Sequence, residues 1–213
     1  MQIAKLALAS ILIDTANLTA KSKTEPVDRE AVEYLEAKIT MVPQEAKSWD
    51  RDRFYEMMQE AKADIGGFSL GEILEKDYKQ WNESGLNLGM SSVVKDLAFL
   101  VDKVEDRSFA ESLDNFMSEK DLKIFAILTS VRPIGGKHLK QMLLQAKPEA
   151  NDAAKAFLRT DAEDLKLEEI DLSGFESQQD PKDGEMWRNV WSRNRSNSSR
   201  KTIAPMLRAA MQR

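Results

Sequence analysis

The sequence predicts an α/β domain in which helices flank a mixed β-sheet. The run KIFAILTSV, residues 123–131, is rich in branched and aromatic side chains and lies between charged residues and a proline-glycine cluster, as a central strand would. Leu86, Leu88 and Met90 alternate with polar or small residues, which is typical of a half-buried strand. Apolar residues at helical spacing recur before, between and after these strands.

The first part of the chain predicts a small, separate unit. Residues 3–13 are apolar on nearly all sides and suit either a buried helix or a buried strand, since their periodicity does not distinguish the two. Pro26 suits the first turn of a helix that is expected to end near Thr40. Proline and dense charge then predict a linker. The expected division is residues 1–42, a linker at 43–52 and a main domain at 53–213.

Three helices are expected in the first half of the main domain. The apolar residues between 54 and 61 have helical spacing. The stretch SLGE, residues 69–72, predicts a capping box, in which serine and glutamate satisfy each other's unpaired backbone donors. We expect the helix that it opens to continue to Trp81, with Lys79 off its apolar stripe. Residues 93–104 return to helical spacing after the strand.

The second half predicts helices at 138–146 and 153–158 and a polar, exposed loop at 175–185. At the C-terminus, a short strand at 202–204 is expected to precede a helix at 205–211.

The composition limits the class of protein. The chain has 213 residues, 42% hydrophobic and 31% charged, which is enough for one good core or two small ones. It has no cysteine, which excludes disulfides, a thiolate nucleophile and a zinc-thiolate site, and a cytoplasmic location is expected. The most apolar segment, residues 3–13, is too short for a membrane span, and no signal peptide is expected.

The net charge of −5 conceals an asymmetry. Residues 186–213 carry seven lysines and arginines and no acid, which leaves −12 on residues 1–185. Such a distribution indicates an anion-binding surface, ion pairing between the two halves, or simply a solvated basic end.

Arg200 and Lys201 are candidates for binding phosphate. Arginine offers a rigid fork to phosphate oxygens, whereas lysine supplies a mobile point charge. Adjacent residues point in different directions, so both would reach one ligand only from a loop or an irregular strand end. The serine-rich stretch before them and Pro205 after them favour such a loop.

Two other kinds of site receive less support. His138 is the one histidine, and nothing in the sequence places a serine or an aspartate beside it, so we expect a surface residue near a helix N-terminus. Trp187 and Trp191, with arginines nearby, could present stacking platforms to nucleic acid. The charge of −12 on the rest of the chain disfavours a long polyanion.

Six short motifs, taken in order, resemble the DHH phosphoesterase superfamily. They are spread from about residue 11 to residue 207 and read ILIDTANLT, KTEPVDREAVEYL, DYKQW, NLGMSSVV, DLKIFAILTS and SRKTIAPML. Their order is similar to that in the exopolyphosphatase and prune-like branch, including its C-terminal DHH-associated domain 2. The likeness is strongest to fungal exopolyphosphatases and manganese-type inorganic pyrophosphatases.

This resemblance implies a DHH-associated domain 2 preceded by a helical remnant of the DHH domain. It also implies hydrolysis of phosphoanhydride bonds in polyphosphate or pyrophosphate, with Mn or Mg as divalent cations. Asp14 matches a carboxylate that coordinates the pair of metal ions. Lys79, Arg200 and Lys201 match cations that contact the substrate phosphates.

The chain departs from the family pattern at its start. The family places a nucleotide-fold half, which supplies the histidine and aspartate metal motifs, before the segment that contains Asp14. A single carboxylate cannot hold two metal ions, which need several ligands each. We therefore expect a substrate-binding half that is not active alone, with a missing N-terminal DHH half as partner. Two alternatives stay open: a non-catalytic polyphosphate- or nucleotide-binding module, and an interaction module in which residues 3–13 lack their packing partner.

Overall fold

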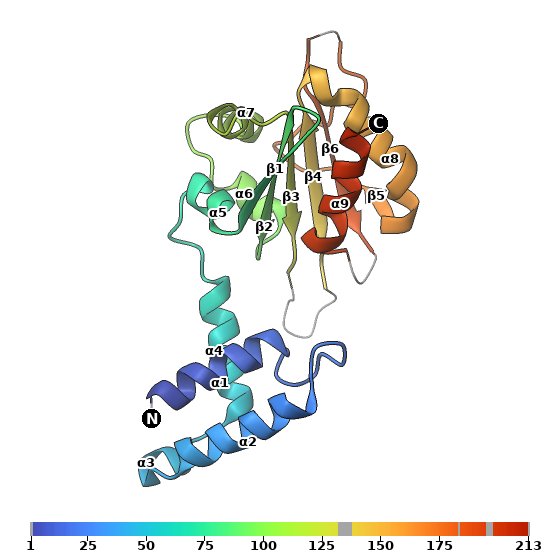
Figure 1. The fold of residues 1–213 in the computed structure, drawn as a ribbon. Helices are drawn as coiled ribbons and strands as arrows, with labels where there is room; N and C mark the ends of the chain where they lie inside the picture. Colours follow the sequence, from blue (N-terminus) through green and yellow to red (C-terminus); the bar gives the residue numbers. More distant parts are fainter. Residues whose placement is uncertain (1, 132–137, 183, 195–197, 213) are drawn as a thin grey trace. The chain divides into compact units, whose positions relative to one another are not determined.

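The computed structural model describes residues 2–131, 138–182, 184–194 and 198–212. The chain divides into two compact units, residues 1–65 and residues 66–213 (Figure 1). Among the described residues, no helix combines the length and the apolar character needed to cross a bilayer.

Unit 1 is helical. Its elements are α1 (Gln2–Asp14), α2 (Pro26–Thr40), α3 (Pro43–Ala46) and α4 (Arg51–Ala63). Leu8 and Leu12 of α1 pack with Val32 and Ile39 of α2 to form its core, and α4 adds partly buried aromatic residues. The apolar opening stretch is thus a helix. The segment expected to be a linker, residues 43–52, contains α3 and the start of α4. Helix α4 packs on the core of unit 1, so this segment belongs to unit 1. The two compact units divide after Ile65.

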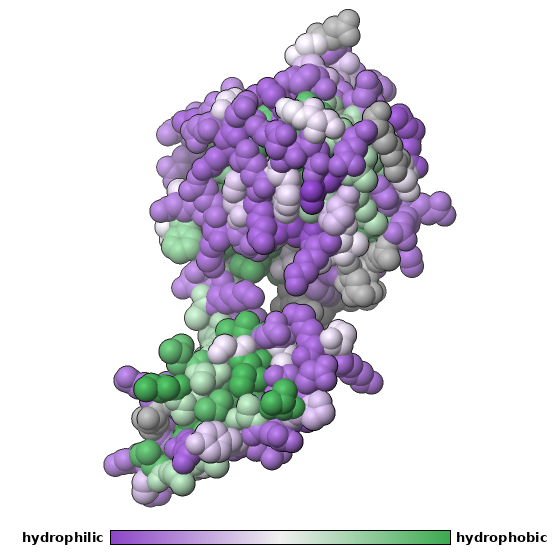
Figure 2. Space-filling view, viewed as in Figure 1, coloured by the Kyte–Doolittle hydropathy of each residue, from purple (hydrophilic) through white to green (hydrophobic). Residues whose placement is uncertain are grey.

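One side of α1 is not buried. Ile3 is 83% exposed and Leu6 is 74% exposed, and Figure 2 shows apolar side chains gathered on the surface of this unit. The expectation of an all-round buried helix is therefore wrong for α1, since only Leu8 and Leu12 are buried in it.

Unit 2 is built on a six-stranded mixed sheet, which confirms the predicted fold class. The strands are β1 (Tyr78–Glu83), β2 (Leu86–Val93), β3 (Ile124–Thr129), β4 (Gln141–Ala146), β5 (Leu167–Glu169) and β6 (Trp187–Arg193). Their order is β1-β2-β3-β4-β6-β5. The β2–β3 pair is parallel and the other pairs are antiparallel. Every residue of β3 is buried, as expected of a central strand.

Helices cover both faces of this sheet (Figure 1). They are α5 (Leu70–Lys76), α6 (Leu97–Val101), α7 (Phe109–Glu119), the 3-10 helix η1 (Pro148–Ala150), α8 (Asn151–Leu165) and α9 (Arg200–Met211). Because strand residues alternate between faces, Ile124, Ala126 and Leu128 pack with α8 and α9. Phe125 faces the other way and packs against Phe116 of α7, with ring centroids 5.0 Å apart.

The helix that begins at the predicted capping box is shorter than expected. The capping box at residues 69–72 is present, but the helix ends at Lys76, and the residues up to Trp81 belong to β1. Ser84 and Gly85 both have positive φ, which is the conformation of a two-residue hairpin turn with the twist that adjacent strands need. Pairing with β2 therefore overrides the apparent helical spacing.

The helix expected at residues 138–146 is wrong, because residues 141–146 form β4. Met142 and Leu144 lie on the α8 and α9 side of the sheet, and Leu143 and Gln145 lie on the other side, where they are buried too. A strand buried on both faces lacks the alternation of apolar and polar residues by which a half-buried strand is recognised. Strand β6, its neighbour, was not anticipated for the same reason. The helices expected at 93–104 and 153–158 exist as the shorter α6 and the longer α8.

Candidate phosphate-binding site

Helix α9 brings the basic end of the chain to the first strand of unit 2. Five buried residues fix it to the sheet: Ile203, Ala204, Leu207, Ala210 and Met211. Its N-terminal Arg200 contacts Asp77, just before β1, and Arg208 near its C-terminal end contacts Glu83, the last residue of β1. The helix therefore runs alongside β1 in the same direction.

Arg200 and Lys201 occupy the first turn of α9, so the expected loop, and the expected strand at 202–204, are wrong. Ser199 has extended φ and ψ and precedes the helix as its N-cap. The helical spacing of the buried apolar residues continues back to Ile203, which extends the helix past Pro205 toward its N-cap.

The Arg200 guanidinium is held by Asp77. Its Nη1 donates to the Asp77 main-chain oxygen and its Nη2 donates to the Asp77 carboxylate, both at 2.6 Å. The Arg200 side chain is 17% exposed, whereas that of Asp77 is 54% exposed. Lys201, by contrast, is exposed. The first turn of α9 contains no acid, so two cations lie at the end of a helix where unpaired backbone N–H groups and the helix dipole already create positive potential.

Lys79 lies on the face of the sheet that α9 covers. In β1, Lys79 shares its face with Trp81, which packs against the core under α8 and α9, and with Glu83, which is bonded to Arg208. Tyr78 faces the opposite side and packs against Phe116. The structure thus places Lys79 on the sheet face that α9 covers, two residues from the aspartate that holds Arg200.

Asp14 lies in the other unit, at the end of α1. Its side chain is 73% exposed and its carboxylate is 3.2 Å from the Lys23 ammonium. In the described parts of the chain, no three histidine, aspartate or glutamate side chains come close enough together to hold a metal ion. These residues therefore do not fit a two-metal centre, and the metal role of Asp14 stays a prediction.

The two tryptophans considered as stacking platforms for nucleic acid are buried in the core. Trp187 and Trp191 stack on each other with ring centroids 5.9 Å apart and are 2% and 3% exposed, because they belong to the core under α9. Buried indoles cannot stack on bases. His138 precedes a strand and not a helix, and its Nε2 lies 2.7 Å from the Ser130 hydroxyl.

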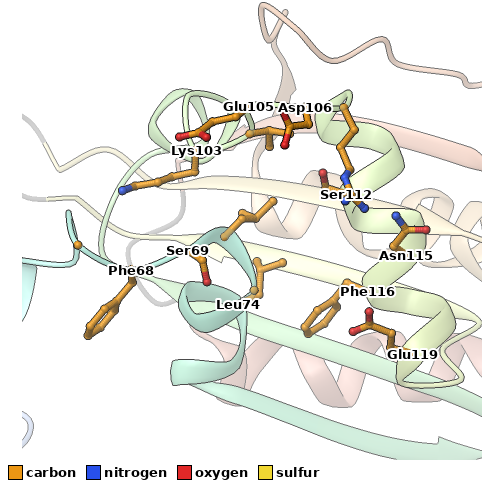
Figure 3. A pocket seen from close by; sticks show the side chains of 15 residues that line it. Phe68, Ser69, Leu74, Lys103, Glu105, Asp106, Ser112, Asn115, Phe116 and Glu119 are labelled. Carbon is orange, nitrogen blue, oxygen red and sulfur yellow. The ribbon is translucent and has the colours of Figure 1, made fainter.

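A pocket of about 590 Å³ lies on the other side of the sheet, between α5 and α7 (Figure 3). Leu74 and Phe116 line it together with side chains of both charges, and the Ser69 hydroxyl at its edge is engaged in the capping box. Its mixed charge does not favour phosphate, and it is separate from α9.

Two residues near the cation cluster were missed from sequence. Asp77 pairs with Arg200, and Arg193, at the end of β6, donates hydrogen bonds to main-chain carbonyl groups beside the start of α9. Neither residue could be identified from the sequence. Asp77 pairs with a residue far along the chain, and Arg193 lies in β6, a strand that the hydrophobic pattern did not predict.

Unit 2 is thus an α/β domain in which helices cover both faces of a mixed sheet, and its family is shown by sequence comparison. The match to the DHHA2 domain family covers residues 56–210, and the chain belongs to this family.

Named relatives agree with this assignment. The chain is 31% identical over 210 residues to a Schizosaccharomyces pombe protein named "Putative exopolyphosphatase", which covers 96% of this chain and 48% of that protein. It is 33% identical over 101 residues to human exopolyphosphatase PRUNE1, covering 46% of this chain and 21% of that protein. The chain therefore spans half the length, or less, of these relatives.

A solved structure shows the same fold. It is the crystal structure of a Methanococcus jannaschii "putative family II inorganic pyrophosphatase", with a TM-score of 0.54 and 18% identity, and the likeness covers 99% of this chain and 55% of that one. The resemblance to the DHH superfamily and the predicted fold class are thus confirmed.

The substitution Asp77→Asn is expected to raise the affinity for polyphosphate about fivefold. It removes a negative charge beside Arg200 but leaves the hydrogen bond to the main-chain oxygen, and one unit charge at about 4 Å is worth about 1 kcal/mol in water. Fluorescence anisotropy with end-labelled polyphosphate measures the change. Glu83→Gln is the matched control, because it removes the charge of the acid that pairs with Arg208 at the other end of α9. Equal effects of the two variants would contradict the prediction.

Proposed function

We propose that this chain is the substrate-binding half of a phosphoanhydride hydrolase, and that it binds the phosphate groups of polyphosphate or pyrophosphate through Lys79, Arg200 and Lys201. The observation that carries the proposal is that Arg200 and Lys201 lie in the first turn of α9, while Lys79 lies in β1 on the sheet face that this helix covers. Membership of the DHHA2 family and the exopolyphosphatase names of the relatives support it.

The arrangement suits a phosphate chain because it combines a partly shielded arginine, two exposed lysines and the N-terminal end of a helix. Arg200 is directed by Asp77 and its guanidinium is partly shielded from water, which strengthens its interaction with an anion. Lys79 and Lys201 are exposed lysines on flexible stems. Because successive helix residues do not face the same way, we propose that Arg200 and Lys201 contact different phosphate groups of one chain. The unpaired N–H groups of α9 add donors that a phosphate oxygen can accept from.

The chemical step is assigned to another part of the complete enzyme. Divalent metal ions in such hydrolases acidify a water molecule and neutralise phosphate oxygens. The described residues of this chain do not fit such a centre. We therefore propose that unit 2 binds and orients the substrate, and that a DHH half supplies the metal ligands.

The double variant Arg200→Ala, Lys201→Ala is expected to weaken polyphosphate binding more than tenfold, since two phosphate contacts are lost together. It should also flatten the dependence of affinity on salt, which scales with the number of phosphates neutralised. Titration calorimetry at two salt concentrations measures both. Arg208→Ala is the matched control, because Arg208 belongs to the same helix but pairs with Glu83. Unchanged affinity in the double variant would show that α9 is not the site.

The 213-residue chain alone is expected to release no orthophosphate from polyphosphate in the presence of Mn or Mg, because its described residues do not assemble a metal centre. A colorimetric phosphate assay over several hours measures this. Metal-dependent release that is lost in Asp14→Asn would contradict the proposed division of roles.

The alternative function as an interaction module is favoured by the exposed apolar side of α1. Ile3 and Leu6 are large apolar residues in contact with water, and such residues, when gathered, mark contact surfaces. A partner domain or a second copy of the chain would cover them.

Replacing Ile3 and Leu6 by lysine is expected to reduce self-association of the chain in static light scattering. The free energy of unfolding should change by less than about 0.5 kcal/mol, because both side chains are exposed. A wild-type chain that stays a monodisperse monomer at high concentration would argue against this surface.

A further inference from the structure

Arg193 is a buried arginine whose side-chain partners among the described residues are all main-chain oxygens. It is the last residue of β6 and is 4% exposed. Its Nε donates to the Gln141 carbonyl at 3.1 Å, its Nη2 donates to the Thr129 carbonyl at 2.8 Å, and its Nη1 donates to the Ser198 carbonyl. The rigid fork of an arginine can satisfy three separate acceptors in this way, whereas the single nitrogen of a lysine cannot.

The three acceptors belong to three different segments. Thr129 ends β3, Gln141 begins β4, and Ser198 directly precedes Ser199, the N-cap of α9. One side chain therefore joins the end of β3 and the start of β4, two interior strands, to the residue before the N-cap of α9.

The cap itself gives the start of α9 little support. The Ser199 side chain makes no capping hydrogen bond, although its main-chain oxygen accepts from Thr202 N and Ile203 N. The two cations of the first turn also lie at the unfavourable end of the helix dipole. The first turn therefore depends on contacts from outside the helix to keep its place.

Burial of Arg193 is unfavourable for its charge, and it lowers the pKa of the guanidinium to about 10. Its three acceptors carry only partial charges, so the group keeps a positive field beside the start of α9. A side chain that only filled space would not need this charge or this geometry.

We propose that Arg193 is a positioning residue of the phosphate-binding site, which fixes the first turn of α9 against the ends of β3 and β4 and so holds Arg200 and Lys201 in place. The proposal rests on the proposed function and deepens it. The substrate contacts belong to Arg200 and Lys201; Arg193 acts through the backbone at Ser198.

The test compares Arg193→Gln and Arg193→Lys with a control on the same strand. Arg188→Gln is that control, because the Arg188 side chain is also mostly buried, at 13% exposed, but pairs with Asp114 of α7 at 3.2 Å on the other face of the sheet. Both sites should lose stability in urea denaturation, so stability alone does not distinguish them. Native-state hydrogen exchange at the amides of Thr202 and Ile203 does, because both bond to the Ser199 oxygen.

In Arg193→Gln and Arg193→Lys we expect exchange at Thr202 and Ile203 to accelerate at least tenfold and polyphosphate affinity to fall at least tenfold. Arg188→Gln should change neither by more than about twofold. Folded Arg193 variants with wild-type exchange rates and wild-type affinity would overturn the proposal. Wild-type affinity in Arg193→Lys would also overturn it, because lysine keeps the positive charge but lacks the three donor nitrogens of the guanidinium.

The exchange measurement separates this proposal from the proposed function. If the wild-type chain binds no polyphosphate, the proposed function fails, and exchange in the Arg193 variants still decides whether this residue holds α9. If Arg193→Gln does not fold, Arg193→Lys provides the same comparison with a smaller change in charge.

Discussion

The packing of α9 on the sheet beside β1 is the contact on which the candidate site depends. Five apolar residues of α9 enter the core under the sheet, and burial of the three large ones, Ile203, Leu207 and Met211, is worth about 1.5–3 kcal/mol each. The ion pairs Arg200–Asp77 and Arg208–Glu83 then set which end of the helix meets which end of β1. Hydrogen bonds from Gln212 and Arg208 lower the pKa of Glu83, as expected of a carboxylate that prefers to stay charged in this place. Hydrophobic burial supplies the energy, and the ion pairs supply the register.

The same ion pairs explain part of the charge asymmetry between residues 1–185 and residues 186–213. From the sequence, residues 186–213 look like an unbalanced basic end. In the structure Arg188, Arg200 and Arg208 each pair with an acid that precedes them by many residues, so part of the asymmetry reflects pairing between the two parts of the chain. Lys79 and Lys201 are exposed, whereas the Arg200 side chain is mostly buried and already paired with Asp77. Net charge alone overestimates the positive surface, whereas the position of each charge determines where a phosphate can bind.

The fold class, the capping box and the strands β2 and β3 could be predicted because their signals are local. Serine and glutamate three residues apart satisfy a helix end by themselves, and a run of branched residues between breakers needs no partner to be recognised. Strands β1 and β4 could not, since β1 depends on its hairpin with β2 and β4 is apolar on both faces. The candidate cations Lys79, Arg200 and Lys201 stay a prediction, and their structural setting could not be predicted, because a serine-rich stretch looks like a loop until the apolar face of α9 is known. Asp77 and Arg193 act through main-chain groups and distant pairs, for which a single sequence carries no pattern.

The start of α9 breaks a local rule while the rest of the helix obeys it. Arginine and lysine in the first turn oppose the helix dipole by about 0.3–1 kcal/mol each. The first turn itself contains no acid, and Asp77 offsets the conflict at Arg200 from outside the helix. The buried face of the helix more than offsets this, so the fold tolerates the conflict. A phosphate bound at the same place would accept from the unpaired N–H groups and neutralise both cations, and it would remove the conflict instead of adding to it. Departures from local preference that a ligand would relieve are expected at functional sites more than elsewhere in a domain. This is the physical reason for assigning the proposed phosphate binding to α9, and not to the pocket between α5 and α7, where the Ser69 hydroxyl is already engaged in the capping box.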